Sequence, residues 1–216
     1  TNTDPWDWEG GRVNSQRLPR FHSMKYPSPW SFFPPPRSFT RGKSQGEEFQ
    51  SQALSPINSD LDDHVRALTH EVGIIPFDLE RVLAFGVEVF VLSEGCAFDS
   101  SLIAVVWQHS LRTGYLAALI SLDQRAGQRI IWQSFVGGVL HDIGMLIFLI
   151  QQPQIFTSAV NIAQSRSWDL QLVERQMLGS THAETGANFL ARWDVDEVLL
   201  TTVACHDDPM KGPHAV

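Results

Sequence analysis

The stretch GGVLHDIGMLIFL, residues 137–149, sets a histidine and an aspartate side by side within an otherwise apolar run. Moving a carboxylate out of water without a partner is costly, so Asp142 needs a compensating charge or hydrogen bonds inside the fold. A bound cation is one source of that compensation. A buried pair with a histidine from another segment, for instance His109, is the other. Either way, the stretch predicts a polar centre inside an apolar core.

The composition indicates a globular protein rather than a membrane or nucleic-acid-binding one. The chain has 216 residues, 43% of them hydrophobic, and a formal net charge of −8, which gives no general attraction for nucleic acid or anionic membranes. Cys96 and Cys205 are far apart and form no CxxC pattern, as is usual in a reducing compartment. The longest apolar run, residues 143–150, is shorter than the ~20 residues of a membrane span, and no signal-peptide core is apparent. We therefore expect a cytoplasmic location.

The chain divides into two unlike parts. Residues 1–58 contain WSFFPPPRSF and other proline-rich patterns, carry a small positive charge and keep no helical or strand period. Because proline removes a backbone donor and blocks helix propagation, we expect a disordered or irregular segment there. Its aromatic residues also fit a docking arm for the main domain or a partner. Residues 59–216 are expected to form one helical domain.

Helical periodicity dominates the second part. Val87, Val89 and Val91 also alternate as in a strand, but helix is favoured there. Asp99 and Ser100 are expected to cap the next helix. Gly137–Gly138 are expected to break the helix that carries the HD dipeptide and to let another helix approach closely. With no strand–helix alternation, the fold class is all-α. Helices are expected over residues 61–72, 77–92, 100–121, 131–150, 153–165, 169–177, 181–193 and 195–205.

Four histidines lie in or beside these apolar helices rather than on a charged face. A single histidine in such a setting is more often a hydrogen-bonded core residue than a ligand. Four of them near an aspartate favour a metal site, because imidazole and carboxylate are common ligands of divalent cations. His141 and Asp142 are expected to lie about 100° apart on one helix and to reach one ion from either side. The four are His109, His141, His182 and His206.

The ordered set of motifs resembles the HD superfamily of metal-dependent phosphohydrolases, and most closely its HDOD (HD-related output domain) branch. WQHS at residues 107–110 is similar to the helix carrying that branch's first histidine, and GGVLHDIGML to its central helix. ACHDDP is similar to its closing turn. The resemblance covers residues 61–209. In between, the pattern "E, then G, then H-x-E-x-G, then W" is matched at Glu174, Gly179, His182, Glu184, Gly186 and Trp193.

The resemblance implies a ligand set and also shows departures from the family pattern. Asp207 stands where the family usually has a second histidine, and is a substitute oxygen ligand. Glu174 and Glu184 are expected to belong to a polar network or to cap helices. The usual N-terminal helical subdomain, a later aspartate ligand and the GYP-type motif of cyclic-di-GMP phosphodiesterases find no match. The resemblance therefore implies that the domain over residues 59–216 is truncated at its C-terminus. The implied metal ligands are His109, His141, Asp142, His182 and His206.

Two functions follow as hypotheses. The favoured one is a non-catalytic output module in bacterial signalling, acting through signalling proteins or domains, in which the histidines and Asp142 form a retained polar network. Few basic residues, chiefly Arg112, are near the motif helices to neutralise phosphate. The alternative is a phosphohydrolase acting on a nucleotide or cyclic dinucleotide with a divalent metal, Fe, Mn or Zn. Nucleic acid and membrane are not expected as partners, and a homo-oligomer is a further option.

Overall fold

The computed structural model describes residues 8–9, 12–13, 56–95, 100–193 and 195–208. The chain falls into two units, residues 1–40 and 41–216. In the first unit, the described residues form a short antiparallel pair of strands, β1 (Trp8–Glu9) and β2 (Arg12–Val13). The predicted irregular segment over residues 1–58 otherwise lies almost wholly outside the described residues.

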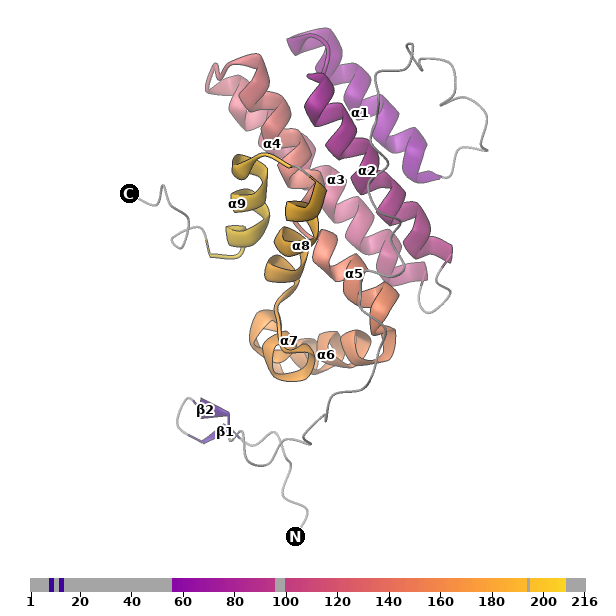
Figure 1. Ribbon diagram of the computed structural model, residues 1–216, viewed down its shortest axis with the longest axis vertical. Helices are drawn as coiled ribbons and strands as arrows, with labels where there is room; N and C mark the ends of the chain where they lie inside the picture. The colour runs from indigo at the N-terminus through magenta and orange to yellow at the C-terminus, as the bar shows by residue number, and fades with distance from the viewer. Residues whose placement is uncertain (1–7, 10–11, 14–55, 96–99, 194, 209–216) are drawn as a thin grey trace. The chain divides into compact units, whose positions relative to one another are not determined.

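The second unit is built from helices, which confirms the predicted all-α class (Figure 1). Because α3 packs along α4 and α5 packs on α8, the segment around the HD dipeptide lies in the middle of the unit. The elements are α1 (Pro56–Val72), α2 (Phe77–Gly95), α3 (Ser100–Asp123), α4 (Gln128–Leu140), α5 (Ile143–Gln151), α6 (Pro153–Arg166), α7 (Leu170–Leu178), α8 (His182–Leu190), the 3-10 helix η3 (Ala191–Trp193) and α9 (Glu197–Cys205).

The helix ends follow from local sequence. Gly73 follows α1 with φ of +94°, a left-handed conformation that glycine adopts without steric cost. Pro153 is the first residue of α6, where its missing N–H costs nothing. The Asp169 side chain caps α7, and Thr181 caps α8 in a capping box with Glu184. The predicted cap at Asp99–Ser100 lies outside the described residues and side chains.

The predicted break at Gly137–Gly138 is wrong, because both glycines lie inside α4. The helix instead ends at the HD dipeptide, and α5 starts at Ile143. The glycines serve close packing: a Cβ on Gly138 would lie 2.5 Å from the Cα of Gly114 in α3. His141 and Asp142 therefore occupy a junction between two helices, and the expected 100° divergence along one helix does not apply.

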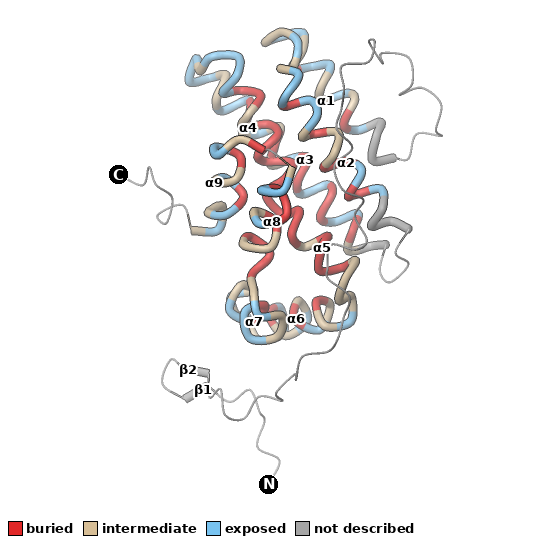
Figure 2. Tube along the Cα trace, viewed as in Figure 1, coloured by how far each residue is buried: buried red, intermediate tan, exposed pale blue. Residues whose placement is uncertain are grey.

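The core is densest at α4 and α5 (Figure 2). Residues 128–151, which cover both helices, are long and apolar enough to cross a membrane, but 78% of the most apolar window is buried inside the protein. This burial and the break at the HD dipeptide mark the segment as a protein core. Beside it, α6 and α7 form a hairpin with a small apolar cluster of its own around Ala159, Ala163 and Val173.

Candidate metal centre

Asp142 lies at the α4–α5 junction and is almost completely buried, with 5% of its surface exposed. Histidines face both of its carboxylate oxygens. Oδ2 lies 3.1 Å from Nε2 of His141 and 3.6 Å from Nε2 of His109. Oδ1 lies 3.3 Å from Nε2 of His206 and 3.5 Å from Nε2 of His182. One carboxylate thus stands between two pairs of imidazole nitrogens.

The other ring nitrogen of three of these histidines is already held by the fold. Nδ1 of His141 donates to the carbonyl of Gly138 at 2.7 Å, and Nδ1 of His206 donates to the carbonyl of Val203 at 2.8 Å. Because Nδ1 makes these outer bonds, Nε2 faces the cluster, where it donates to Asp142 when the ring is protonated and offers a lone pair to a cation when the ring is neutral. This orientation by an outer hydrogen bond is typical of metal-ligating histidines.

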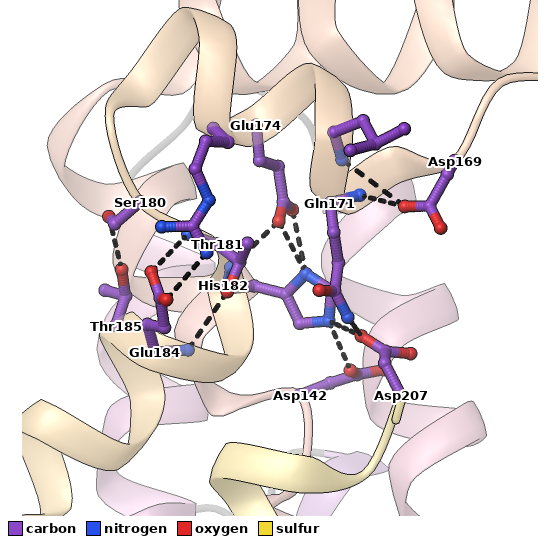
Figure 3. A network of polar contacts seen from close by, with 12 residues as sticks. Asp142, Asp169, Gln171, Glu174, Ser180, Thr181, His182, Glu184, Thr185 and Asp207 are labelled. Atoms are coloured by element: carbon purple, nitrogen blue, oxygen red, sulfur yellow. Dashed lines mark hydrogen bonds and ion pairs between the residues drawn. The ribbon is translucent and has the colours of Figure 1, made fainter. Parts of the chain in front are cut away.

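His182 is held by a carboxylate instead of a carbonyl (Figure 3). Glu174 of α7 is fully buried and accepts a hydrogen bond from the backbone N–H of His182 at 2.8 Å. The ring Nδ1 of His182 lies 2.9 Å from Oε1 and 2.8 Å from Oε2 of the same carboxylate. The capping box at Thr181 starts α8 at this residue. Glu174 acts on the cluster by positioning His182.

Asp207 adds a further oxygen from the turn after α9. Its Oδ2 lies 3.0 Å from Nε2 of His182 and 3.3 Å from Nε2 of His206. The Nε2 amide of Gln171 in α7 donates to the same oxygen. Gln171 and Glu174 are three residues apart on one face of α7, so this helix braces two members of the cluster.

The close approach of these groups shifts their proton equilibria. Burial disfavours the ionised form of Asp142, but hydrogen bonds from His141 and His206 outweigh it and hold its pKa well below the usual range. Burial likewise disfavours protonated His182, yet hydrogen bonds to Asp207 and Glu174 raise its pKa to about 10. The hydrogen bond from His182 lowers the pKa of Asp207 to about 2. These shifts favour the protonated form of His182 beside the ionised carboxylates of Asp142 and Asp207.

Among the residues that the structure describes, two groups of donors fit a metal ion. In each, the ligand atoms lie within 4.8 Å of one another: His109, His141 and Asp142 form the first, and Asp142, His182 and His206 the second. Asp142 belongs to both. Nε2 atoms face each other at 3.1 Å between His109 and His141 and at 3.2 Å between His182 and His206. Two lone pairs at that distance repel unless a proton or a cation lies between them. The nitrogen and oxygen donors suit Zn, Fe or Mn.

The cluster opens into a cavity of about 540 Å³. His109 lies at its open side, because 59% of its side chain is exposed, whereas His141 and His182 are buried. Four aspartates and four histidines contribute to the lining, and no lysine or arginine does among the residues that the structure describes. The lining residues are His109, His141, Asp142, Met145, Asp169, Leu170, Gln171, His182, His206, Asp207 and Asp208.

The structure gathers the residues that the sequence singled out, with one exception. All five predicted ligands meet at one place, and Asp207 joins them. Glu174 supports the cluster, but Glu184 is not part of it: it completes the capping box and pairs with Arg175 at 2.6 Å. Sequence reasoning missed Gln171, whose only signal is its place one helical turn before Glu174.

A helical domain whose central helix breaks at a buried His–Asp pair, surrounded by histidines from other helices, is an HD-type domain. The family model of the HDOD domain matches residues 60–209. The chain therefore belongs to the HDOD family, as its motifs predicted.

Two known proteins are similar to the chain. An uncharacterized protein of Treponema pallidum (strain Nichols) is 30% identical over 111 residues, which are 51% of this chain and 21% of that protein. The chain thus spans about a fifth of that relative's length. A crystal structure of an HDOD domain protein with unknown function from Geobacter sulfurreducens matches with a TM-score of 0.52 and 18% identity, over 77% of this chain and 63% of the other. This second likeness shows a shared fold.

Proposed function

We propose that this HDOD domain is a non-catalytic regulatory module of bacterial signal transduction that binds a divalent cation and acts through protein partners in the cytoplasm. The observation that carries the cation is the arrangement around Asp142. Imidazole Nε2 atoms face both of its oxygens, while the Nδ1 atoms of three rings are tied to Gly138, Val203 and Glu174. Such outer hydrogen bonds orient a ligand before the ion arrives.

Each residue of the cluster would contribute a different ligand atom to the cation. Asp142 supplies the buried negative charge, and His182 and His206 supply nitrogen from one side while His109 and His141 supply it from the other. Asp207, held by Gln171, adds an oxygen to the His182 side. A bound divalent ion would neutralise the buried carboxylates and, in an enzyme, would activate water.

The lining of the cavity favours a regulatory role over phosphate chemistry. Phosphoryl substrates carry several negative charges, which enzymes usually neutralise with lysine or arginine as well as with metal. Here the described lining offers Asp142, Asp169, Asp207 and Asp208 and no lysine or arginine. A phosphodiester would meet these carboxylates with only the cation and the histidines to offset them. The cluster is therefore better suited to stabilising one arrangement of helices α3, α5, α7, α8 and α9.

A second candidate function, a metal-dependent phosphohydrolase acting on a nucleotide or cyclic dinucleotide, is favoured by one feature. Two donor groups share Asp142 and lie beside an open cavity, which is the arrangement that two-metal hydrolysis requires. His109, exposed at the open side, would be reachable by a substrate. This candidate predicts that Asp142→Asn removes turnover together with metal.

The deciding experiment measures metal and turnover on the same samples. Wild type, Asp142→Asn and the exposed control Asp123→Asn are expressed in Fe-, Mn- or Zn-supplemented medium and measured by plasma mass spectrometry. Each sample is then assayed with bis(p-nitrophenyl) phosphate and cyclic di-GMP. We expect stoichiometric metal in wild type and the control, loss in Asp142→Asn, and no turnover. Metal-free wild type contradicts the cation site, and Asp142-dependent turnover contradicts the non-catalytic role.

A further inference from the structure

A second cavity, of about 760 Å³, adjoins the metal centre. It lies among α3, α4 and α9, and each helix lines it with residues three or four positions apart, which share one helical face. We call it the three-helix groove. The lining residues used below are His109, Thr113 and Ala117 of α3, Ile130, Gln133, Ser134 and Gly138 of α4 with His141 directly after it, and Val198 and Thr202 of α9 with His206 and Asp207 directly after it.

On each of the three helices, the lining residues form a row along one face, and each row ends in a histidine of the metal centre. The groove and the cavity at the cluster share His109, His141, His206 and Asp207, so they are continuous at these side chains. From His206 back to Val198 is eight residues, about 12 Å along a helix. The row on α3 has the same length. The groove therefore extends about 12 Å from the cluster, with small residues such as Gly138 nearest to it.

The walls of the groove offer apolar surface and few free hydrogen-bonding groups. Ser134 Oγ contacts Ser121 Oγ at 2.8 Å and donates to the carbonyl of Ile130. Thr202 Oγ1 donates to the carbonyl of Val198, and Gln133 donates to Asp196.

The far end of the groove is apolar and open to water. Ile130 is 55% exposed and Val198 is 56% exposed, and both line the groove. Water at these side chains would be released if an apolar body covered them, which favours binding.

We propose that the three-helix groove binds a small molecule with an oxyanion head group, carboxylate or phosphate, at the histidine cluster and an apolar body along the groove. The inference rests on the proposed function, because the cation held by the cluster is what binds the head group. On the groove side the described lining holds three of the histidines and, of the four aspartates of the first cavity, Asp207, so a single head group meets fewer carboxylates here than a phosphodiester would in the first cavity. A nucleotide or an extended peptide fits less well, since its many polar groups would find the side chains of Ser134, Thr202 and Gln133 already engaged. The ligand is therefore an amphiphilic anion, and the module senses it.

The test compares three probes on the metal-loaded chain of 216 residues by isothermal titration calorimetry. Octanoate has both features, acetate has the head group alone, and 1-octanol has the apolar body alone. Each buried methylene group contributes about 0.8 kcal/mol, so burying two of them raises the binding affinity about tenfold. We expect octanoate to bind at least tenfold more tightly than either of the others. Octyl phosphate against octanoate then distinguishes the two head groups.

A matched pair of variants locates the site. Ile130→Asp places a charge in the groove, whereas Ile120→Asp makes the same change on an isoleucine that is 63% exposed and does not line the groove. We expect Ile130→Asp to weaken octanoate binding about tenfold and Ile120→Asp to leave it unchanged, with equal metal content and equal melting temperatures.

The outcomes separate this inference from the proposed function, because metal content is measured in the same samples. Stoichiometric metal with equal affinity for octanoate and acetate overturns the groove inference and leaves the cation site intact. Equal effects of Ile130→Asp and Ile120→Asp overturn it as well. A metal-free wild type contradicts the proposed function, and octanoate that then fails to bind overturns the groove too.

Discussion

Replacing Glu174 with glutamine isolates the contribution of the outer hydrogen bonds to the metal centre. Glu174 is fully buried, and its two oxygens accept from the ring and the backbone N–H of His182. Glutamine keeps the size of the side chain but turns one acceptor into a donor, so one N–H of His182 meets another donor. Hydrogen bonds to charged groups contribute about 1.5–3 kcal/mol and neutral ones about 0.5–1.5 kcal/mol.

The expected results follow from these magnitudes. The free energy of unfolding should fall by about 1–3 kcal/mol, measured by urea denaturation in the presence of a chelator. Metal affinity should fall by about 10–100-fold, as is usual when the partner of a ligating histidine is lost, measured by competition with a chromogenic chelator.

Glu88→Gln, an exposed change of the same kind on α2, serves as the control and should alter stability by less than about 0.5 kcal/mol. Unchanged metal affinity in a folded Glu174→Gln variant would refute the positioning role of Glu174.

Three further outcomes are expected. Gly138→Ala should destabilise the fold by about 1–3 kcal/mol in urea denaturation, because the new Cβ would meet the backbone of α3. Gly127→Ala, where a Cβ would have no neighbouring atom within 4 Å, should not, and equal effects of the two variants would contradict the packing described for Gly138. Thr181→Ala should lower stability by about 1 kcal/mol with metal content retained, and loss of metal would show that the cap does more than start α8. A cation present at about 100 times its Kd adds about 2.7 kcal/mol, so chelation should lower Tm by about 5–10 °C in a thermal scan; an unchanged Tm would exclude a tightly bound cation.

Much of the fold follows from hydrophobic periodicity and a few end signals. The apolar pattern places the helices within a few residues of their observed bounds, and Gly73 and Pro153 mark ends that the structure keeps. At Gly137–Gly138 the predicted break is wrong, but the close approach of other helices that these glycines also predict is confirmed by their contacts with α3 and α9. Tertiary packing outweighs the local preference there.

The candidate site is predictable to the extent that its residues carry ordered motifs. His109, His141, His182 and His206 come from four parts of the chain, and their order alone indicates that they meet. The hydrogen bond from Gln171 to Asp207 joins two ordinary polar side chains that are 36 residues apart in the sequence, so no local sequence pattern predicts it. The break of the helix at Asp142, which turns its carboxylate toward both histidine pairs, likewise becomes visible only in three dimensions.

The most direct test of the central claim is an anomalous difference map from crystals of metal-supplemented protein, recorded at the absorption edge of the metal found in solution. We predict a peak beside the Asp142 carboxylate within bonding distance, about 2.0–2.3 Å, of at least two histidine Nε2 atoms. A well-ordered cluster without such a peak, in protein that carries stoichiometric metal elsewhere, would contradict the claim that Asp142 is compensated by a cation.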